Sequence, residues 1–240
     1  MNKYADRRVE QTLAIDAPVD AVWKALTDAT ELTRWFPLAA SVIPGAGGVI
    51  RMGWDESYDA DSAIEIWEPN RHLRIGFPHH PPVLLATDYH LESTRGRTIL
   101  RVVTSGFGEG SDWDDWYSGV SAGWDFELRG LKHYLEHHRG EDRMVASARH
   151  PLSIPRESAW DRLTGRGGWL EHTGLSGSVL VRTPPVQLVM SVDQLNDGIL
   201  RVELEFGNRV IAWLATWGVP RATIDTINVE WQRTLPAALA

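Results

Sequence analysis

The residues best suited to chemistry in this sequence are its histidines, which could together bind a metal ion. The candidates are His79, His80, His90, His133 and the pair His137–His138. Among them only His133 and His137 have the four-residue spacing that places two side chains on one helix face, and no carboxylate is placed to complete a zinc-binding set. We therefore interpret these histidines as solvated surface residues and predict neither a metal nor any other cofactor.

Nucleophilic catalysis is not indicated either. Serines are present, but none lies in the sharp strand-to-helix turn that exposes a catalytic serine, and no orienting base is recognisable. The glycine-rich segment 44–48 lacks both phosphate-loop patterns and is typical of a hairpin turn. The sequence thus predicts no catalytic residues and no hydrolytic activity.

The composition narrows the class of protein. The chain has 240 residues, 43% of them hydrophobic, and a formal net charge of -8, which disfavours nucleic acid and anionic membranes as partners. It has no cysteine, no apolar run at its N-terminus and no stretch long enough to cross a membrane, so we expect a cytoplasmic protein. Its 12 tryptophans indicate either heavy core packing or a wide aromatic pocket.

The first half of the chain predicts one antiparallel sheet that faces one long helix. Alternation predicts a strand over 9–15, Pro18 is suited to the start of a helix, and a short helix over 29–36 ends at Pro37. Further strands are expected at 39–43, 49–54, 63–67, 72–77, 83–93 and 98–107. Ser111 can then cap a long helix, along which apolar side chains recur at spacings of three and four: Trp113, Trp116, Tyr117, Val120, Trp124, Leu128, Leu131 and Leu135.

The second half repeats the first in a shortened form. The matches, in chain order, are 18–26 with 155–163, Trp35 with Trp169, 81–83 with 184–186, 99–102 with 199–202, 107–108 with 206–207 and 119–120 with 218–219. The separation between matched residues shrinks after Trp35, which indicates that the second copy lacks the segment holding the second, third and fourth strands. We expect it to have about four strands.

This order of elements resembles that of the SRPBCC superfamily, which includes START domains, polyketide cyclases and birch-pollen-allergen-like proteins. Residues 8–138 resemble in particular the bacterial proteins named after the activator of the heat-shock-protein ATPase, in the segments 15–23, 32–36, 66–73 and 123–124. The resemblance implies an α+β helix-grip fold, with an antiparallel sheet wrapped on a long C-terminal helix and an apolar cavity between them. We therefore predict a complete helix-grip domain at 1–140 and a truncated second one at 141–240. The resemblance does not imply a reaction, because this fold hosts carriers, sensors and enzymes alike.

Strand parity predicts which side chains face that cavity. Charged residues within 200–206 must face solvent, and the same alternation on the matched strands turns Asp88, His90 and Glu92 outward. We expect the ligand-binding residues to be Trp35, Phe36, Trp54, Ile66, Ile75, Phe77, Thr87, Tyr89, Leu91, Val102, Thr104, Trp113, Trp116, Tyr117, Val120 and Trp124. Such a lining suits an apolar molecule with one or two hydrogen-bonding groups.

Three functions are compatible with these features. The leading hypothesis is non-catalytic binding of a small hydrophobic molecule. The second is a cyclase-like or dehydratase-like enzyme acting on a polyketide-like substrate, which would need Arg51 or Glu65 to turn inward as a proton-transfer group. The third is a protein-interaction role, as a chaperone regulator in a stress response or as a dimer scaffold. The family name by itself does not establish a chaperone partner.

The truncated second copy is expected to be structural. Its shortened sheet cannot enclose a full pocket, and the apolar run over 210–217 needs cover. We expect packing of the two copies on each other first, and homodimerisation second.

Overall fold

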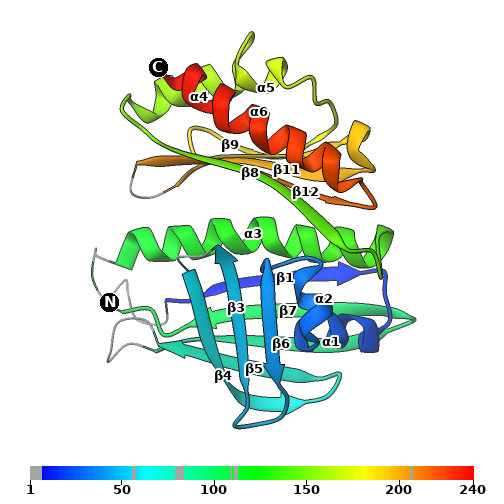
Figure 1. Ribbon diagram of the computed structural model, residues 1–240. Helices are drawn as coiled ribbons and strands as arrows, with labels where there is room; N and C mark the ends of the chain where they lie inside the picture. Colours follow the sequence, from blue (N-terminus) through cyan, green and yellow to red (C-terminus); the bar gives the residue numbers. More distant parts are fainter. Residues whose placement is uncertain (1–6, 56–57, 79–83, 109, 111–112, 206–207) are drawn as a thin grey trace. The chain divides into compact units, whose positions relative to one another are not determined.

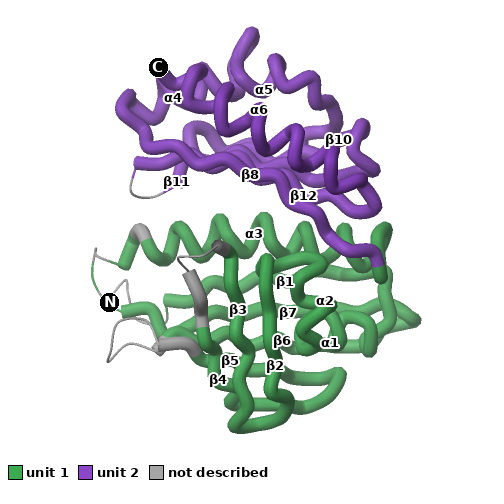
Figure 2. The backbone as a smooth tube through the Cα atoms, viewed as in Figure 1, with its two compact units in different colours: residues 1–140 green, residues 141–240 purple. Residues whose placement is uncertain are grey.

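The computed structural model describes residues 7–55, 58–78, 84–108, 110, 113–205 and 208–240 (Figure 1). The chain splits into two compact units, Met1–Gly140 and Glu141–Ala240, called unit 1 and unit 2 below (Figure 2). Each unit contains one antiparallel sheet and one long C-terminal helix. Within the described part of the chain, no helix is both long enough and apolar enough to span a membrane.

Unit 1 is a seven-stranded sheet with the long helix α3 along one face (Figure 1). Its elements are β1 (Val9–Ile15), α1 (Val19–Thr27), α2 (Ala29–Thr33), β2 (Ala39–Ile43), β3 (Val49–Asp55), β4 (Tyr58–Glu68), β5 (His72–Pro78), β6 (Leu84–Thr94), β7 (Arg97–Ser105) and α3 (Asp114–His137). The strand order is β1-β7-β6-β5-β4-β3-β2, a meander whose last strand pairs with the first. The predicted α+β helix-grip class is confirmed.

Local sequence signals explain several boundaries in unit 1. Pro18, in extended conformation, occupies the N-cap of α1, where its missing N–H costs no helical hydrogen bond. The carboxylate of Asp28 accepts a 3.0 Å hydrogen bond from the backbone N–H of Glu31 and so caps α2. Helix α3 begins at Asp114 with Trp113 at its cap, and the predicted cap, Ser111, lies outside the described residues.

Unit 2 has a shorter version of the same arrangement. Its elements are β8 (Arg143–Pro151), α4 (Arg156–Thr164), α5 (Trp169–His172), β9 (Val179–Thr183), β10 (Gln187–Val192), the 3-10 turn η2 (Asp193–Leu195), β11 (Gly198–Glu205), β12 (Arg209–Trp217) and α6 (Arg221–Leu239). The sheet has five strands in the order β8-β12-β11-β10-β9, and the apolar face of α6 joins one core with it through Ile224, Trp231 and Leu235. The second copy is shorter, as expected, but the expected count of about four strands was wrong. Strand β9 corresponds to β4, so unit 2 lacks counterparts of the second and third strands but not of the fourth.

The sheet order also corrects part of the residue matching between the copies. Strand β12 pairs with β8 as β7 pairs with β1, so β12 corresponds to β7, and β11 corresponds to β6. The match of 199–202 to 99–102 was therefore wrong by one strand. The match of 81–83 with 184–186 was wrong in the same way, because 81–83 precede β6 whereas 184–186 precede β10, the counterpart of β5. The match of 18–26 with 155–163 agrees with the structure, because Pro18 and Pro155 cap α1 and α4, and Trp23 and Trp160 are both buried on those helices.

Candidate functional site

The inner face of the unit 1 sheet carries a small polar patch in an apolar surface. Directly opposed residues of antiparallel strands share a face. Thr87 on β6 lies opposite Ile75 on β5 and Thr104 on β7, and the next inward residue, Tyr89, lies opposite Leu73 and Val102. All six side chains are at most 4% exposed. The strand parity expected from the sequence is correct at these positions.

Two of these side chains, Thr87 and Thr104, form a hydrogen-bonded chain with Trp124 of α3. Trp124 Nε1 donates a 2.8 Å hydrogen bond to Thr104 Oγ1, which lies 3.0 Å from Thr87 Oγ1. Either threonine can donate to the other, but each hydroxyl carries only one hydrogen. Whichever direction is taken, one hydroxyl hydrogen remains without an acceptor among the described residues. The chain therefore presents a spare donor inside the apolar interior.

Two more hydroxyls on this face lack a partner. Tyr89 is 4% exposed, and none of the described residues forms a hydrogen bond with its hydroxyl. Burial raises the pKa of Tyr89, so the phenol stays protonated and remains a donor. Ser62, opposite Ile50 and fully buried, has an Oγ that likewise finds no partner in the described part of the chain. Sequence reasoning missed Ser62 because it began this strand at residue 63.

Aromatic rings connect this patch to the short helices. Phe36 lies 5.0 Å from Trp35, 5.1 Å from Trp54 and 5.7 Å from Trp124, measured between ring centroids, and Trp124 lies 5.9 Å from Tyr89. These five predicted residues thus form one continuous group. Within it Trp35 is fixed by a 2.8 Å hydrogen bond from its Nε1 to the carbonyl of Ala25, so it anchors the group to α1.

A second aromatic group lies at the start of α3. Phe107 contacts Trp113 and Tyr117 at centroid distances of 6.4 Å and 5.5 Å, and the same cluster includes Val120 and Trp124. The expected residues Trp113, Tyr117 and Val120 therefore meet at Phe107, which sequence reasoning did not include. Trp116 differs from the expectation, because its 45% exposed side chain lies off the buried stripe of α3.

A β-bulge changes one predicted site residue. The register between β4 and β5 shifts between Ile64 and Ile66, so that Ile66 lies opposite Arg74 and Trp67 lies opposite the buried Leu73. Because Arg74 is on the outer face, the bulge turns Ile66 outward and Trp67 inward. Trp67 then packs edge-on against Trp23 at 5.2 Å. The expectation for Ile66 was wrong, since simple alternation assumes an unbroken register.

The remaining expected residues are of two kinds. Leu91 is 8% exposed and lies opposite the fully buried Leu100, so it belongs to the inner face. The side chain of Phe77 lies outside the described residues.

Neither Arg51 nor Glu65, the two groups that could have acted as inward-facing acids or bases, faces the interior. Arg51 pairs with Asp61 at 2.7 Å and Glu65 pairs with Arg74 at 2.7 Å, and both ion pairs lie on the outer face.

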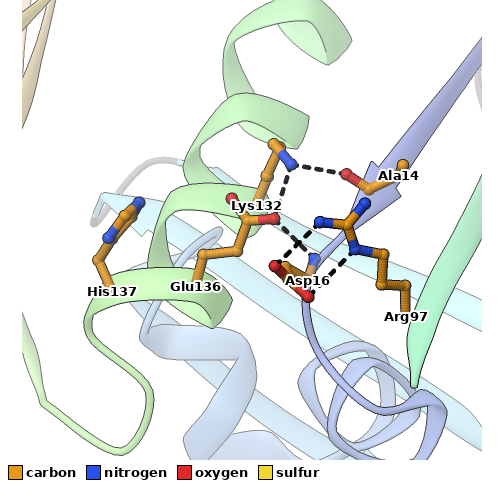
Figure 3. Close-up of a pocket in the computed structure, with 6 residues that line it drawn as sticks. All are labelled: Ala14, Asp16, Arg97, Lys132, Glu136 and His137. Atoms are coloured by element: carbon orange, nitrogen blue, oxygen red, sulfur yellow. Dashed lines mark hydrogen bonds and ion pairs between the residues drawn. The ribbon is translucent and has the colours of Figure 1, made fainter. Parts of the chain in front are cut away.

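The charged side chains of a cleft beside the C-terminal end of α3 pair with one another, which indicates that they stabilise the fold rather than bind a ligand. Its volume is about 380 Å³, and Figure 3 shows Lys132 and Glu136 of α3 turned toward Asp16 and Arg97. Glu136 Oε1 accepts 2.6 Å hydrogen bonds from the backbone N–H of Asp16 and from Lys132 Nζ. Arg97 donates to both carboxylate oxygens of Asp16 and lowers the pKa of that carboxyl. The charges satisfy one another and fasten α3 to the segment between β1 and α1.

A seven-stranded antiparallel sheet closed on a long helix, with buried hydroxyls between them, defines a helix-grip protein of the SRPBCC type. Residues 16–136 match the model of the family described as Activator of Hsp90 ATPase homolog 1-like protein, and the chain belongs to this family. No curated protein sequence matches the chain.

Solved structures separate into those similar to one unit and those similar to the whole chain. Protein MLL2253 from Mesorhizobium loti is 25% identical, with a TM-score of 0.50, over 55% of this chain and 98% of its own. DynU16 from the dynemicin biosynthetic locus is 18% identical over 98% of this chain and 97% of its own, with a TM-score of 0.50. The di-domain ARO/CYC BexL from the BE-7585A biosynthetic pathway is 15% identical over 97% and 91%, also with a TM-score of 0.50. At these identities the two full-length similarities show a shared fold.

Proposed function

We propose that unit 1 binds a small, largely apolar molecule between the inner face of its sheet and α3, and that it does so without catalysing a reaction. The observation that carries this proposal is the Tyr89 hydroxyl. The residue is 4% exposed in an apolar row, and none of the described residues hydrogen-bonds its hydroxyl. A hydroxyl without a partner in apolar surroundings costs about 1–3 kcal/mol, and a ligand that accepts its hydrogen would remove that cost.

The neighbouring groups indicate what that ligand would carry. The pair Thr87–Thr104 has one hydroxyl hydrogen without an acceptor. Tyr89, two residues further along β6 on the same face, provides a second hydroxyl. Both can donate, so the ligand would need at least one acceptor such as a carbonyl or hydroxyl oxygen. The rings of Phe36, Trp54 and Trp124 would supply the apolar contact.

The enzyme alternative has less support. A cyclase-like or dehydratase-like reaction requires an acid or base beside the substrate. Arg51 and Glu65 face outward in ion pairs, and the raised pKa of Tyr89 keeps the phenol protonated, so no phenolate is available at neutral pH to act as a base. The hydroxyls of the inner face can orient a carbonyl group, but they are not suited to accept a proton from the carbon next to it.

We also propose a cytoplasmic location, which a cysteine-free chain would suit.

The test compares two tyrosines. Native mass spectrometry of the freshly purified protein would first show whether a small molecule is retained. A fluorescent fatty-acid analogue is then titrated into wild type, Tyr89→Phe and Tyr134→Phe. Tyr134 is an equally buried control, whose hydroxyl donates to Glu31 Oε2 at 2.5 Å and accepts from the N–H of Gly140 at 3.0 Å.

We expect Tyr89→Phe to weaken the binding of a retained, oxygen-bearing molecule or of the probe by roughly tenfold, the value of one hydrogen bond. Its stability should stay equal or rise, because the variant removes an unpaired hydroxyl. Tyr134→Phe should lose stability and keep its affinity. Absence of binding to wild type, or equal affinity in wild type and Tyr89→Phe, would contradict the proposal.

A further inference from the structure

The outer face of the unit 1 sheet brings together two histidines and an aspartate that are far from the proposed ligand. His72 on β5 lies directly opposite His90 on β6, and Asp88 lies on the same face of β6, two residues from His90. His72 Nε2 is 2.8 Å from Asp88 Oδ1, and the two imidazole rings stack with centroids 4.2 Å apart. One ligand atom from each of the three residues lies within 4.8 Å of the other two.

We propose that His72, Asp88 and His90 bind a divalent transition-metal ion, and that Zn²⁺ fits them best. Two imidazoles and one carboxylate are a donor set that zinc accepts, with bonds of about 2.0 Å and donors therefore about 3.3 Å apart. One pair of ligand atoms, His72 Nε2 and Asp88 Oδ1, is 2.8 Å apart, and all three lie within 4.8 Å of one another, so rotation of the side chains would bring them to that spacing. Binding replaces the hydrogen bond between His72 and Asp88, with the His72 proton carried on Nδ1 while Nε2 binds the metal.

The surroundings hold the carboxylate in position for this role. Arg74 lies opposite Asp88, its Nη1 donates to Asp88 Oδ2, and its Nε donates to Glu65 Oε2 at 2.7 Å. Oδ1 is thereby left toward the histidines. Such outer contacts orient metal ligands in known sites. The side chains of His72 and Asp88 are only 18% and 14% exposed, so the pair is preorganised rather than loose.

The local charges permit a cation. Arg101 lies opposite His90 but pairs with Glu10 at 2.6 Å, and Glu68, opposite His72, adds a carboxylate at the same edge. A neutral imidazole is the form of histidine that binds a metal.

Three protein ligands leave a fourth coordination position, and a cleft lies next to it. The cleft has a volume of about 430 Å³, and its lining includes Thr12, Glu68, Arg71, His72, His90 and Arg101. Open positions of this kind hold water or a small ligand in zinc sites with three protein ligands. This site lies on the opposite face of the sheet from Tyr89, so the two proposals fail or succeed independently.

The test uses the full chain without a polyhistidine tag. Isothermal titration with Zn²⁺ should show one ion bound per chain, and Co²⁺ should give the strong visible absorption of a four-coordinate site. His72→Gln and His90→Gln should each weaken Zn²⁺ binding roughly tenfold or more and remove the Co²⁺ band. His150→Gln, on β8 of unit 2, and Asp61→Asn, an ion-paired acid on the same outer face, are the matched controls and should bind as wild type does.

Circular dichroism verifies the fold of each variant, and the wild-type titration decides the matter even where a variant unfolds. The proposal is overturned if wild type binds no stoichiometric Zn²⁺. It is equally overturned if folded His72→Gln and His90→Gln bind as tightly as wild type, or if His150→Gln loses binding to the same extent.

Discussion

The indole N–H of Trp124 and the hydroxyl of Thr104 form a 2.8 Å hydrogen bond that joins the middle of α3 to the inner face of β7. Both groups lie where the apolar interior offers few alternatives, since Thr104 is 1% exposed and Trp124 packs against Tyr89 and Phe36. The bond therefore sets the rotation of a ring that belongs to both aromatic groups. Changing it should affect the packing of helix on sheet as well as the proposed ligand site.

Thr104→Val should lower the free energy of unfolding by about 1–3 kcal/mol, because the partly buried indole N–H of Trp124 loses its acceptor while the side-chain volume is kept. Urea unfolding followed by tryptophan fluorescence measures this. Thr12→Val, at an exposed position of β1, is the control and should change stability by less than about 0.5 kcal/mol. Equal stability of Thr104→Val and wild type would show that the bond is not made in solution.

Alkaline pH should reveal the buried state of Tyr89. Burial raises the pKa of this phenol in the folded protein, so above the ordinary tyrosine value of about 10 the unfolded chain loses the proton while the folded chain keeps it. The stability that the protonated Tyr89 contributes to the folded state is therefore fully present below pH 10 and is lost as the pH rises above this value. Urea unfolding of wild type and Tyr89→Phe at pH 8 and pH 11 should therefore show wild type losing more stability. Parallel losses in both proteins would mean that Tyr89 is accessible to water.

Glu136 should contribute more to the free energy of unfolding than an ordinary surface carboxylate does. Its Oε1 accepts hydrogen bonds from a backbone N–H and from Lys132, and its side chain is 16% exposed, so we expect Glu136→Ala to cost about 1.5–3 kcal/mol. Arg129→Ala breaks a more exposed ion pair with Asp125 on the same helix and should cost about 0.5 kcal/mol or less. Thermal unfolding of the two variants checks the order. Similar losses would place the Glu136 contacts among ordinary surface pairs.

Two glycines of unit 1 should respond in opposite directions to alanine. A Cβ at Gly108 would lie 2.2 Å from Trp113 Nε1, so Gly108→Ala must displace that ring from Phe107 and should destabilise the protein by about 1–3 kcal/mol. Gly123, inside α3, has nothing within 4 Å of such a Cβ. Gly123→Ala should therefore stabilise by about 0.5–1 kcal/mol. Melting temperatures of both variants test this, and the same sign for both would contradict it.

Features that depend on the pattern within a single strand could be predicted from the sequence. Alternation along β6 and β7 placed Thr87, Tyr89 and Thr104 on the buried face, and it did so although the matching between copies was wrong by one strand. The reason is that each strand carries its own alternation, so parity does not depend on which strand it is matched to. Strand β9 was missed because four of its five side chains are exposed and show no buried alternation.

Features that depend on how strands pair could not be predicted in this way. The bulge after Ile64, which exchanges Ile66 for Trp67 on the inner face, leaves no mark on the apolar pattern. His72 and His90 are 18 positions apart, and only the register of β5 with β6 makes them neighbours. Parity placed Tyr89 inside, but the lack of a partner for the Oγ of Ser62 is visible only once the surrounding side chains have positions.

Residues 1–140 should fold without the rest of the chain. This segment contains the whole seven-stranded sheet, the helix α3 and the contacts that fasten α3 to β1 and the segment that follows it, namely the hydrogen bonds of Lys132 to the Ala14 carbonyl and of Glu136 to the Asp16 N–H. Tyr134 also closes the end of the unit by accepting from the N–H of Gly140. We expect the isolated segment to show a single cooperative unfolding transition in urea, detected alike by far-ultraviolet circular dichroism and tryptophan fluorescence. It should also retain the Zn²⁺ affinity of the full chain, because His72, Asp88 and His90 all lie within it. Separate transitions for the two probes, or an aggregated product, would show that unit 1 depends on residues 141–240, and the boundary at Gly140 would then not mark an independent domain.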